Sequence, residues 1–167
     1  QGQSTLYAKK GSMIAYQGSF KFDKVLLDPN GGGMVRNLIN HASRRLTGEN
    51  MELMKVTGEG YCFMADEAQH VTIINLEAGN PVSVESENLL AFTENVKYGV
   101  RMIGVGVISQ KGLFTSKLEA TGYGAQVAVK TDGNPLILQT PCVVDPDAVV
   151  CWTGPDPSFK LGVSWKT

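Results

Sequence analysis

The sequence has 167 residues, which is enough for one domain with a hydrophobic core of its own. Hydrophobic residues make up 43% of the chain and charged residues 19%, and this composition excludes an intrinsically disordered protein. With a net charge of -1, the chain lacks the excess of basic residues that is typical of nucleic-acid-binding proteins, so we expect no nucleic-acid partner.

Hydropathy and cysteine usage indicate a cytoplasmic protein. The longest apolar stretch, residues 100–108, is interrupted by Arg101 and by glycines, and it is far shorter than the roughly 20 residues that span a bilayer. The first residues show no charged-then-apolar leader. Cys62, Cys142 and Cys151 are odd in number and form no CxxC pair, which argues against a disulfide framework. We therefore predict a location in the cytoplasm and no membrane span.

Apolar and polar residues alternate along much of the chain, and this period of two is typical of half-buried β-strands. The 19 glycines fall mainly between these stretches, where they suit tight turns. The sequence therefore predicts an all-β fold. In chain order, strands are expected at residues 6–8 and 13–16, around Phe20 and Phe22, and at residues 51–56, 61–65, 71–76, 113–120, 126–129, 136–138 and 159–165.

One segment breaks this alternation. Over residues 34–46 the apolar side chains recur at helical spacing, with arginines between them. We predict one short amphipathic helix there, which would cap the open end of the β core. The alternative is that this helix offers Arg36, Arg44 and Arg45 to an anionic partner.

A first internal repeat is the sequence Thr-Gly-x-Gly, found at residues 57–60 and again at residues 121–124. Each copy follows one predicted strand and precedes another. We interpret both copies as tight reversals in which glycine supplies a positive φ.

A second repeat covers residues 82–93 and 142–153. Each copy comprises a strand, an acidic turn and a strand that ends in an aromatic residue, and residues 13–16 resemble half of a third copy. This order predicts a pseudo-threefold, repeated β-hairpin sandwich or barrel, with residues 1–167 forming a single β-rich domain. A further Gly-x-Gly strand pair is missing after Trp165, so we expect that the C-terminus is truncated or that a neighbouring chain completes the edge.

The cysteines allow a geometric test. If the second copy is a hairpin, Cys142 faces Cys151 at a distance that a disulfide can bridge. The matching residues of the earlier copy are Val82 and Ala91, which are core residues, so packing is the favoured interpretation and a redox-sensitive pair the alternative. Cys62 is likewise interpreted as structural.

The two histidines, His41 and His70, have no His or Cys at ligand spacing, which argues against a zinc site. A Cys–His nucleophile pair that meets in space stays open as an alternative. The Gly-x-Gly stretches do not open helices, which argues against a nucleotide site.

The repeated acidic turns pair Glu85 with Glu87 and Asp145 with Asp147. Paired carboxylates can hold a metal or share a proton, but solvated turns favour the same residues, and we prefer that interpretation. No catalytic, cofactor-binding or metal-binding residue is assigned.

Several stretches resemble a known family. They are residues 10–16 (KGSMIAY), 46–49 (LTGE), 57–60 (TGEG), 88–92 (NLLAF) and 145–152 (DPDAVVCW). Together they are similar to the altered-inheritance-of-mitochondria family, number twenty-four of that series, in its actinobacterial form. The resemblance covers nearly the whole chain. It implies a β-rich, pseudo-threefold fold similar to the tryptophan RNA-binding attenuation protein, a tendency to oligomerise and no established enzyme activity.

We therefore predict a non-enzymatic, oligomer-forming scaffold or binding protein that uses no cofactor. The alternative is a small-ligand or RNA-binding module resembling the attenuation protein, which predicts that basic side chains gather on one rim of a ring. The basic residues expected on that rim are Arg36, Arg44, Arg45, Lys55 and Lys130. An enzyme would instead need a closed pocket with a histidine beside a cysteine or carboxylate, and we expect none.

Overall fold

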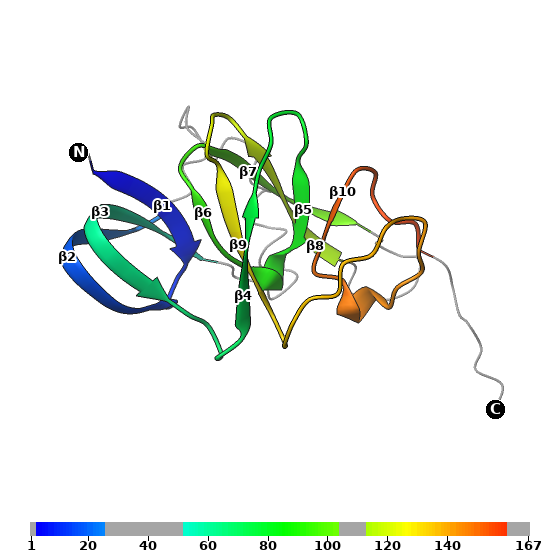
Figure 1. The fold of residues 1–167 in the computed structure, drawn as a ribbon, viewed down its shortest axis with the longest axis horizontal. Coiled ribbons are helices and arrows are strands. Elements are labelled where there is room, and N and C mark those ends of the chain that lie inside the picture. The colour runs from blue at the N-terminus through cyan, green and yellow to red at the C-terminus, as the bar shows by residue number, and fades with distance from the viewer. Residues whose placement is uncertain (1–2, 26–51, 104–112, 160–167) are drawn as a thin grey trace.

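The computed structural model describes residues 3–25, 52–103 and 113–159, and in these residues the chain forms two antiparallel β-sheets (Figure 1). Almost all of the regular structure is β-strand, so the predicted all-β fold is confirmed. The strands are β1 (Ser4–Lys9), β2 (Met13–Lys24), β3 (Leu53–Met64), β4 (His70–Asn75), β5 (Val82–Glu85), β6 (Leu89–Thr93), β7 (Val96–Ile103), β8 (Leu113–Ala120), β9 (Gln126–Thr131) and β10 (Cys151–Thr153), with short 3₁₀ helices η1 (Ser86–Asn88) and η2 (Pro146–Ala148).

The larger sheet has six strands in the order β2-β3-β1-β6-β9-β4, and the smaller has four in the order β10-β5-β8-β7. Neither sheet closes into a barrel within the described part of the chain. The predicted pseudo-threefold repeat is not confirmed, because strands that the repeat would pair with each other lie in different sheets.

The hydrophobic core joins the two sheets. Leu89 of β6 and Leu118 of β8 are completely buried, and burial of such a side chain contributes about 2 kcal/mol. A stack of three rings also links the sheets, because Phe92 of β6 lies between Tyr7 of β1 at 5.5 Å and Tyr98 of β7 at 5.1 Å between ring centroids. Further core members are Val82, Val84, Val96, Ala125, Val127 and Val129.

The first repeat does not have one structure. Residues 57–60 lie inside β3, which runs unbroken through both glycines. The predicted chain reversal at this copy is therefore wrong. Residues 121–124 do form a turn, between β8 and β9, and Gly124 has a φ of 76° as a reversal requires. The strands predicted at residues 51–56 and 61–65 are accordingly one strand.

The two acidic turns of the second repeat have the same local structure, but the predicted pairing of its strands is wrong. Glu85 and Asp145 each accept a hydrogen bond from the backbone N–H two residues later, and each begins a 3₁₀ helix. The flanking strands do not form hairpins, because β5 pairs with β8 and β10 whereas β6 pairs with β1 and β9. The 3₁₀ helix η1 is therefore a corner between two sheets.

The segment 132–150 differs most from expectation. The predicted strand at residues 136–138 and the first strand of the later repeat copy are irregular and exposed in the structure. Pro135, Pro141 and Pro146 interrupt the segment, and each removes a backbone donor that a strand ladder needs.

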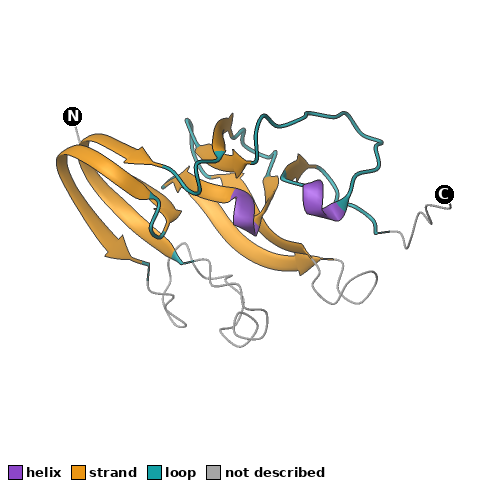
Figure 2. Cartoon of the chain, turned by 90° about the horizontal axis from the view of Figure 1, so that it is seen from below, coloured by secondary structure: helices purple, strands orange, loops and turns teal. Residues whose placement is uncertain are grey.

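The helix expected at residues 34–46 lies outside the described residues, as does nearly all of the strand expected at residues 159–165. Among the described residues, no helix has the length and apolar character needed to cross a membrane. The long β2–β3 ribbon occupies one end of the molecule and segment 132–150 the other, as both views show (Figure 1, Figure 2).

Candidate functional site

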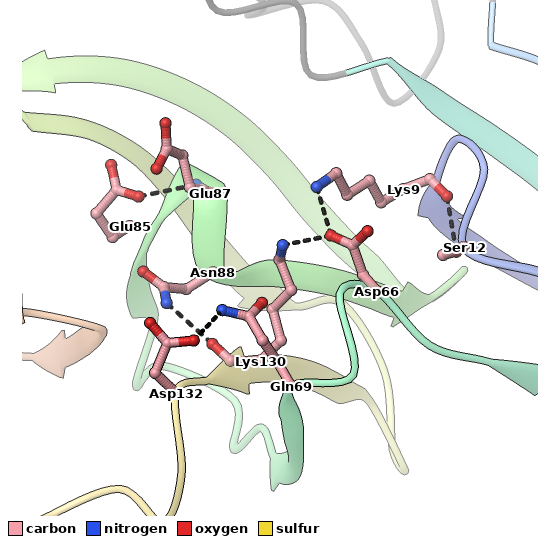
Figure 3. Close-up of polar contacts among 9 residues, drawn as sticks. All are labelled: Lys9, Ser12, Asp66, Gln69, Glu85, Glu87, Asn88, Lys130 and Asp132. Carbon is pink, nitrogen blue, oxygen red and sulfur yellow. Dashed lines mark hydrogen bonds and ion pairs between the residues drawn. The ribbon is translucent and has the colours of Figure 1, made fainter.

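A cluster of charged side chains gathers around the turn between β3 and β4, with contributions from the end of β1 and from β9 (Figure 3). The Asp66 carboxylate lies just after β3 and accepts hydrogen bonds from two ammonium groups through the same oxygen, Oδ2. Lys9 Nζ is 2.5 Å from this oxygen, and Lys130 is the second donor. Lys130 is only 4% exposed, and the Asp66 carboxylate is the partner that offsets the cost of burying its ammonium group. We call these three residues the Asp66 cluster.

Local backbone structure positions the Asp66 cluster. Ser12, in the turn after β1, donates its hydroxyl to the Lys9 carbonyl at 2.7 Å, and its own carbonyl accepts from the Ala65 N–H at 2.8 Å. The turn after Asp66 uses two residues with positive φ, Glu67 at 50° and Ala68 at 54°. These contacts bring the ends of β1 and β3 together.

The electrostatics of the Asp66 cluster suit an ion pair more than a catalytic group. Hydrogen bonds from Lys130 and then Lys9 lower the pKa of the Asp66 carboxyl. Burial is the largest single influence on Lys9 and lowers its pKa, but the hydrogen bonds and the charges of the nearby Asp66 and Glu67 carboxylates together outweigh it, so the pKa of Lys9 is raised. A general acid or base needs a pKa near the working pH, and both shifts move away from neutrality. Both shifts favour the charged forms of Asp66 and Lys9.

This arrangement corrects the predicted basic rim. Lys130 is buried and ion-paired, so it cannot contribute to an exposed rim. Lys55 is exposed on β3, and Arg36, Arg44 and Arg45 lie outside the described residues. The sequence did not reveal the partnership because Lys9, Asp66 and Lys130 are far apart along the chain.

A second site is the ribbon of β2 and β3, which bends sharply (Figure 2). The rings of Tyr16 and Phe22 are 5.5 Å apart between centroids, whereas six residues of a straight strand would separate them by about 20 Å. Phe20 lies 5.7 Å from Tyr16 in the same cluster. The face that carries these three rings is therefore concave.

Glycines make this bend sterically possible. Gly18 and Gly60 are paired across the ribbon, with φ of 122° and 126°, a region that other residues rarely adopt. A Cβ atom on Gly60 would lie 2.1 Å from the carbonyl oxygen of Gln17. A Cβ atom on Gly58 would lie 2.2 Å from the carbonyl oxygen of Ser19. The Thr-Gly-x-Gly stretch of β3 is thus a bend element.

The opposite, convex face of the ribbon exposes apolar side chains. Tyr61 is 70% exposed and Phe63 is 55% exposed. Ile14, at the register irregularity near the start of β2, is also exposed. Strand β2 is the edge of the larger sheet, and its outer side has no strand partner within the described residues. Such an edge combined with exposed rings is typical of an interaction surface.

The structure separates the predicted cysteine pair. Cys151 lies opposite Val84 in the smaller sheet, and Cys142 is exposed in the irregular segment, so the expected facing of the two cysteines was wrong. Cys62 lies opposite Tyr16 on the concave face of the ribbon, where burial raises the pKa of its thiol. Burial also raises the pKa of Cys151. All three are free thiols, and the raised pKa values disfavour the reactive thiolate of Cys62 and Cys151.

The other predicted site residues are dispersed. His70 is exposed at the start of β4, and His41 lies outside the described residues. The Glu85 and Asp145 carboxylates cap their own 3₁₀ helices, and burial raises the pKa of Glu85. Among the described residues, no group of three or more His, Cys, Asp or Glu side chains is arranged to hold a metal ion.

The ion pair between Arg101 and Asp156 was not predicted from the sequence. Arg101 of β7 forms a two-pronged pair with Asp156, at 2.6 Å and 2.5 Å, and also donates to the Ser83 hydroxyl at 3.2 Å. The pair ties the chain after β10 to the outer face of the smaller sheet. Beside it, a shallow groove of about 240 Å³ presents Lys97 and Lys117. The sequence held no signal for this contact, which arises from tertiary packing.

Comparisons with known proteins agree with the resemblance noted in the sequence. The sequence model of the Mitochondrial biogenesis AIM24 family matches residues 1–161. No curated protein matches the chain. Among solved structures, the crystal structure of protein SPYM3_0169 from Streptococcus pyogenes is similar, with a TM-score of 0.54 and 15% sequence identity. At this low identity the likeness shows the fold alone. The alignment covers 80% of this chain and 57% of that chain, so the chain spans less than two thirds of that protein's length.

The expected likeness to the tryptophan RNA-binding attenuation protein is not shown by this structural match and stays a prediction. The family match, in contrast, extends over nearly the entire sequence. The chain therefore belongs to the Mitochondrial biogenesis AIM24 family.

Proposed function

We propose that this chain is a non-enzymatic, self-associating protein whose β2–β3 ribbon binds a second copy of the chain. The observation that carries the proposal is an edge strand, β2, beside exposed aromatic side chains. Edge strands offer unpaired backbone N–H and C=O groups, and tyrosine and phenylalanine are enriched in protein interfaces.

The charges of the ribbon support a second copy as the partner. Strand β2 carries Lys21 and Lys24 around Asp23, and β3 carries Lys55 and Glu59. Charges of both signs are therefore interspersed along the ribbon. A surface of this kind meets a copy of the same chain without the strong repulsion that a single sign would produce.

The polar sites support a role without catalysis. Asp66 is held between two lysines, and the repeated acidic turns satisfy their own backbone. We include a cytoplasmic location in the proposal, because the cysteines are free thiols and a reducing compartment keeps them so.

The test is the mass of the protein in solution, measured by light scattering after size-exclusion chromatography over a range of concentrations. We expect the wild type to be oligomeric and the double variant Tyr61→Thr/Phe63→Thr to dissociate, with a dissociation constant raised at least about tenfold. Threonine keeps the strand propensity of the ribbon, so circular dichroism should not change.

Tyr123→Thr is the matched control. Tyr123 lies fully exposed in the β8–β9 turn, so its replacement removes an exposed ring outside the ribbon. The control should keep the wild-type mass. An unchanged mass for the ribbon variant, or a wild type that stays monomeric at all concentrations, would overturn the proposal.

A further inference from the structure

Segment 132–150 exposes an unusual number of aliphatic side chains. Ile137 is 86% exposed and Val143 is 90% exposed. Isolated exposed apolar residues are normal on a protein surface, but a contiguous group of them marks an interaction site. The exposed members are Leu136, Ile137, Leu138, Val143 and Val144.

Local sequence and tertiary structure disagree over this segment. The sequence at residues 136–138 and 142–144 favours extended strands, yet the structure pairs neither stretch with a strand of the described chain. The prolines that interrupt the segment, Pro135, Pro141 and Pro146, flank these two stretches and do not lie within them, so each stretch keeps the backbone donors that a strand partner needs. A strand partner supplied by another molecule resolves the disagreement.

Charge indicates which surface supplies that partner. Segment 132–150 carries Asp132, Asp145 and Asp147 and no lysine or arginine. The β2–β3 ribbon, in contrast, carries three lysines and two carboxylates, an excess of one positive charge. Two of the lysines are ion-paired, Lys21 with Asp23 and Lys24 with Glu52. An acidic aliphatic surface and a more basic aromatic surface are complementary in charge, and both bury apolar area when they meet.

The two surfaces cannot meet within one molecule. The ribbon lies at the end of the molecule beside the N-terminus, and the segment between β9 and β10, yellow to orange in Figure 1, lies at the opposite end. We propose that segment 132–150 of one copy docks on the β2–β3 ribbon of the next copy, head to tail. This inference rests on the proposed function, since it names the surface that the ribbon binds.

A head-to-tail contact has a consequence that a symmetric contact lacks. Each copy uses two different surfaces, so every copy added exposes a fresh surface at each end. Association then proceeds until the copies close into a ring, or continues as a filament if they do not close.

Complementation between two variants tests the inference. The segment variant Leu136→Ser/Ile137→Ser removes two exposed side chains, and the ribbon variant Tyr61→Thr/Phe63→Thr removes two others. We expect each variant alone to be monomeric where the wild type is oligomeric. An equimolar mixture should form a 1:1 heterodimer and nothing larger, because only one intact pair of surfaces remains. Native mass spectrometry with one variant isotopically labelled measures this directly.

The outcomes separate the inference from the proposed function. If the ribbon variant dissociates but the segment variant keeps the wild-type mass, the ribbon binds itself and only the docking inference falls. If both variants are monomeric and their mixture stays monomeric, the docking inference also falls. If the wild type is monomeric at all concentrations, both proposals fall. Tyr123→Thr should assemble as the wild type does.

Discussion

The β2–β3 ribbon and the paired sheets are built from the same kind of sequence, yet they treat apolar residues in opposite ways. In β5, Val82 and Val84 alternate with Ser83, and both valines are buried. In β3, Tyr61 and Phe63 alternate with Cys62, and both rings are exposed. Alternation therefore specifies a strand and its two faces, but it does not specify what covers the apolar face.

The difference comes from what lies opposite each face. The paired sheets cover each other, and the stack of Tyr7, Phe92 and Tyr98 connects them. The ribbon extends beyond this stack. Its glycine bend turns the rings of Tyr16 and Phe22 toward each other on the concave face. Its convex face then has no layer above it among the described residues.

The largest expected effect is a difference in the free energy of unfolding between a substitution in the paired sheets and one in the ribbon. Leu118→Ala removes a completely buried side chain and should lower the free energy of unfolding by about 4 kcal/mol, from lost burial and the cavity left behind. Phe63→Thr removes an exposed ring and should change it by no more than about 0.5 kcal/mol. Urea unfolding of monomeric protein measures both. Similar losses would mean that the ribbon face is covered within the molecule.

A somewhat smaller loss should come from the junction between the two regions. Asp66→Asn leaves the buried Lys130 ammonium without a carboxylate, and we expect a loss of about 3 kcal/mol at neutral pH. Asp23→Asn, which breaks an exposed pair with Lys21, is the control and should cost less than about 0.5 kcal/mol.

The same variant has a pH signature. The folded-state pKa of Asp66 is lowered, so its contribution is present above the usual value of 3.8 and is lost as the pH falls through the folded-state value. Glu85 has a raised pKa and contributes in the opposite direction, losing stability as the pH rises through that value. The wild type should therefore lose its advantage over Asp66→Asn below about pH 4. An advantage that does not change with acid would remove the ion pair as its cause.

The smallest expected loss of stability comes from a substitution that tests whether glycine is needed for the bend of the β2–β3 ribbon. Gly60→Ala places a Cβ atom in a left-handed conformation and against the Gln17 carbonyl, and we expect a loss of about 2 kcal/mol. Nuclear Overhauser contacts between the Tyr16 and Phe22 rings should disappear while those between Tyr7 and Phe92 stay. Gly99→Ala, with open space at its Cβ, is the control. Retained contacts between Tyr16 and Phe22 would show that glycine is not required there.

Much of the fold could be predicted from local pattern. The strand at residues 113–120 was confirmed to the residue, and the acidic turn at Glu85 was confirmed as a capped turn. Pairing could not be predicted, because the chain leaves one sheet for the other at η1 and no local residue states where the next strand goes. The Thr-Gly-x-Gly stretch in β3 was misassigned because glycine permits both a reversal and a close approach of two strands.

The candidate sites depended still more on tertiary structure. The Asp66 cluster joins residues from three separate segments, so neither composition nor spacing could find it. The exposed rings of Tyr61 and Phe63 were visible in the sequence only as strand residues, because exposure depends on the neighbouring layer. The family resemblance, carried by short stretches of sequence, was confirmed.

The position of β1 has a consequence for how the molecule forms. This strand lies inside the larger sheet, where Tyr7 pairs with Lys55 on one side and with Phe92 on the other. The β3 partner is synthesised before the β6 partner, so the second edge of β1 stays open until Phe92 has left the ribosome. Closure over such separations carries a large entropy cost, which slows folding and prolongs exposure of strand edges. The arrangement makes timing during synthesis, as well as final stability, a determinant of the yield of native protein.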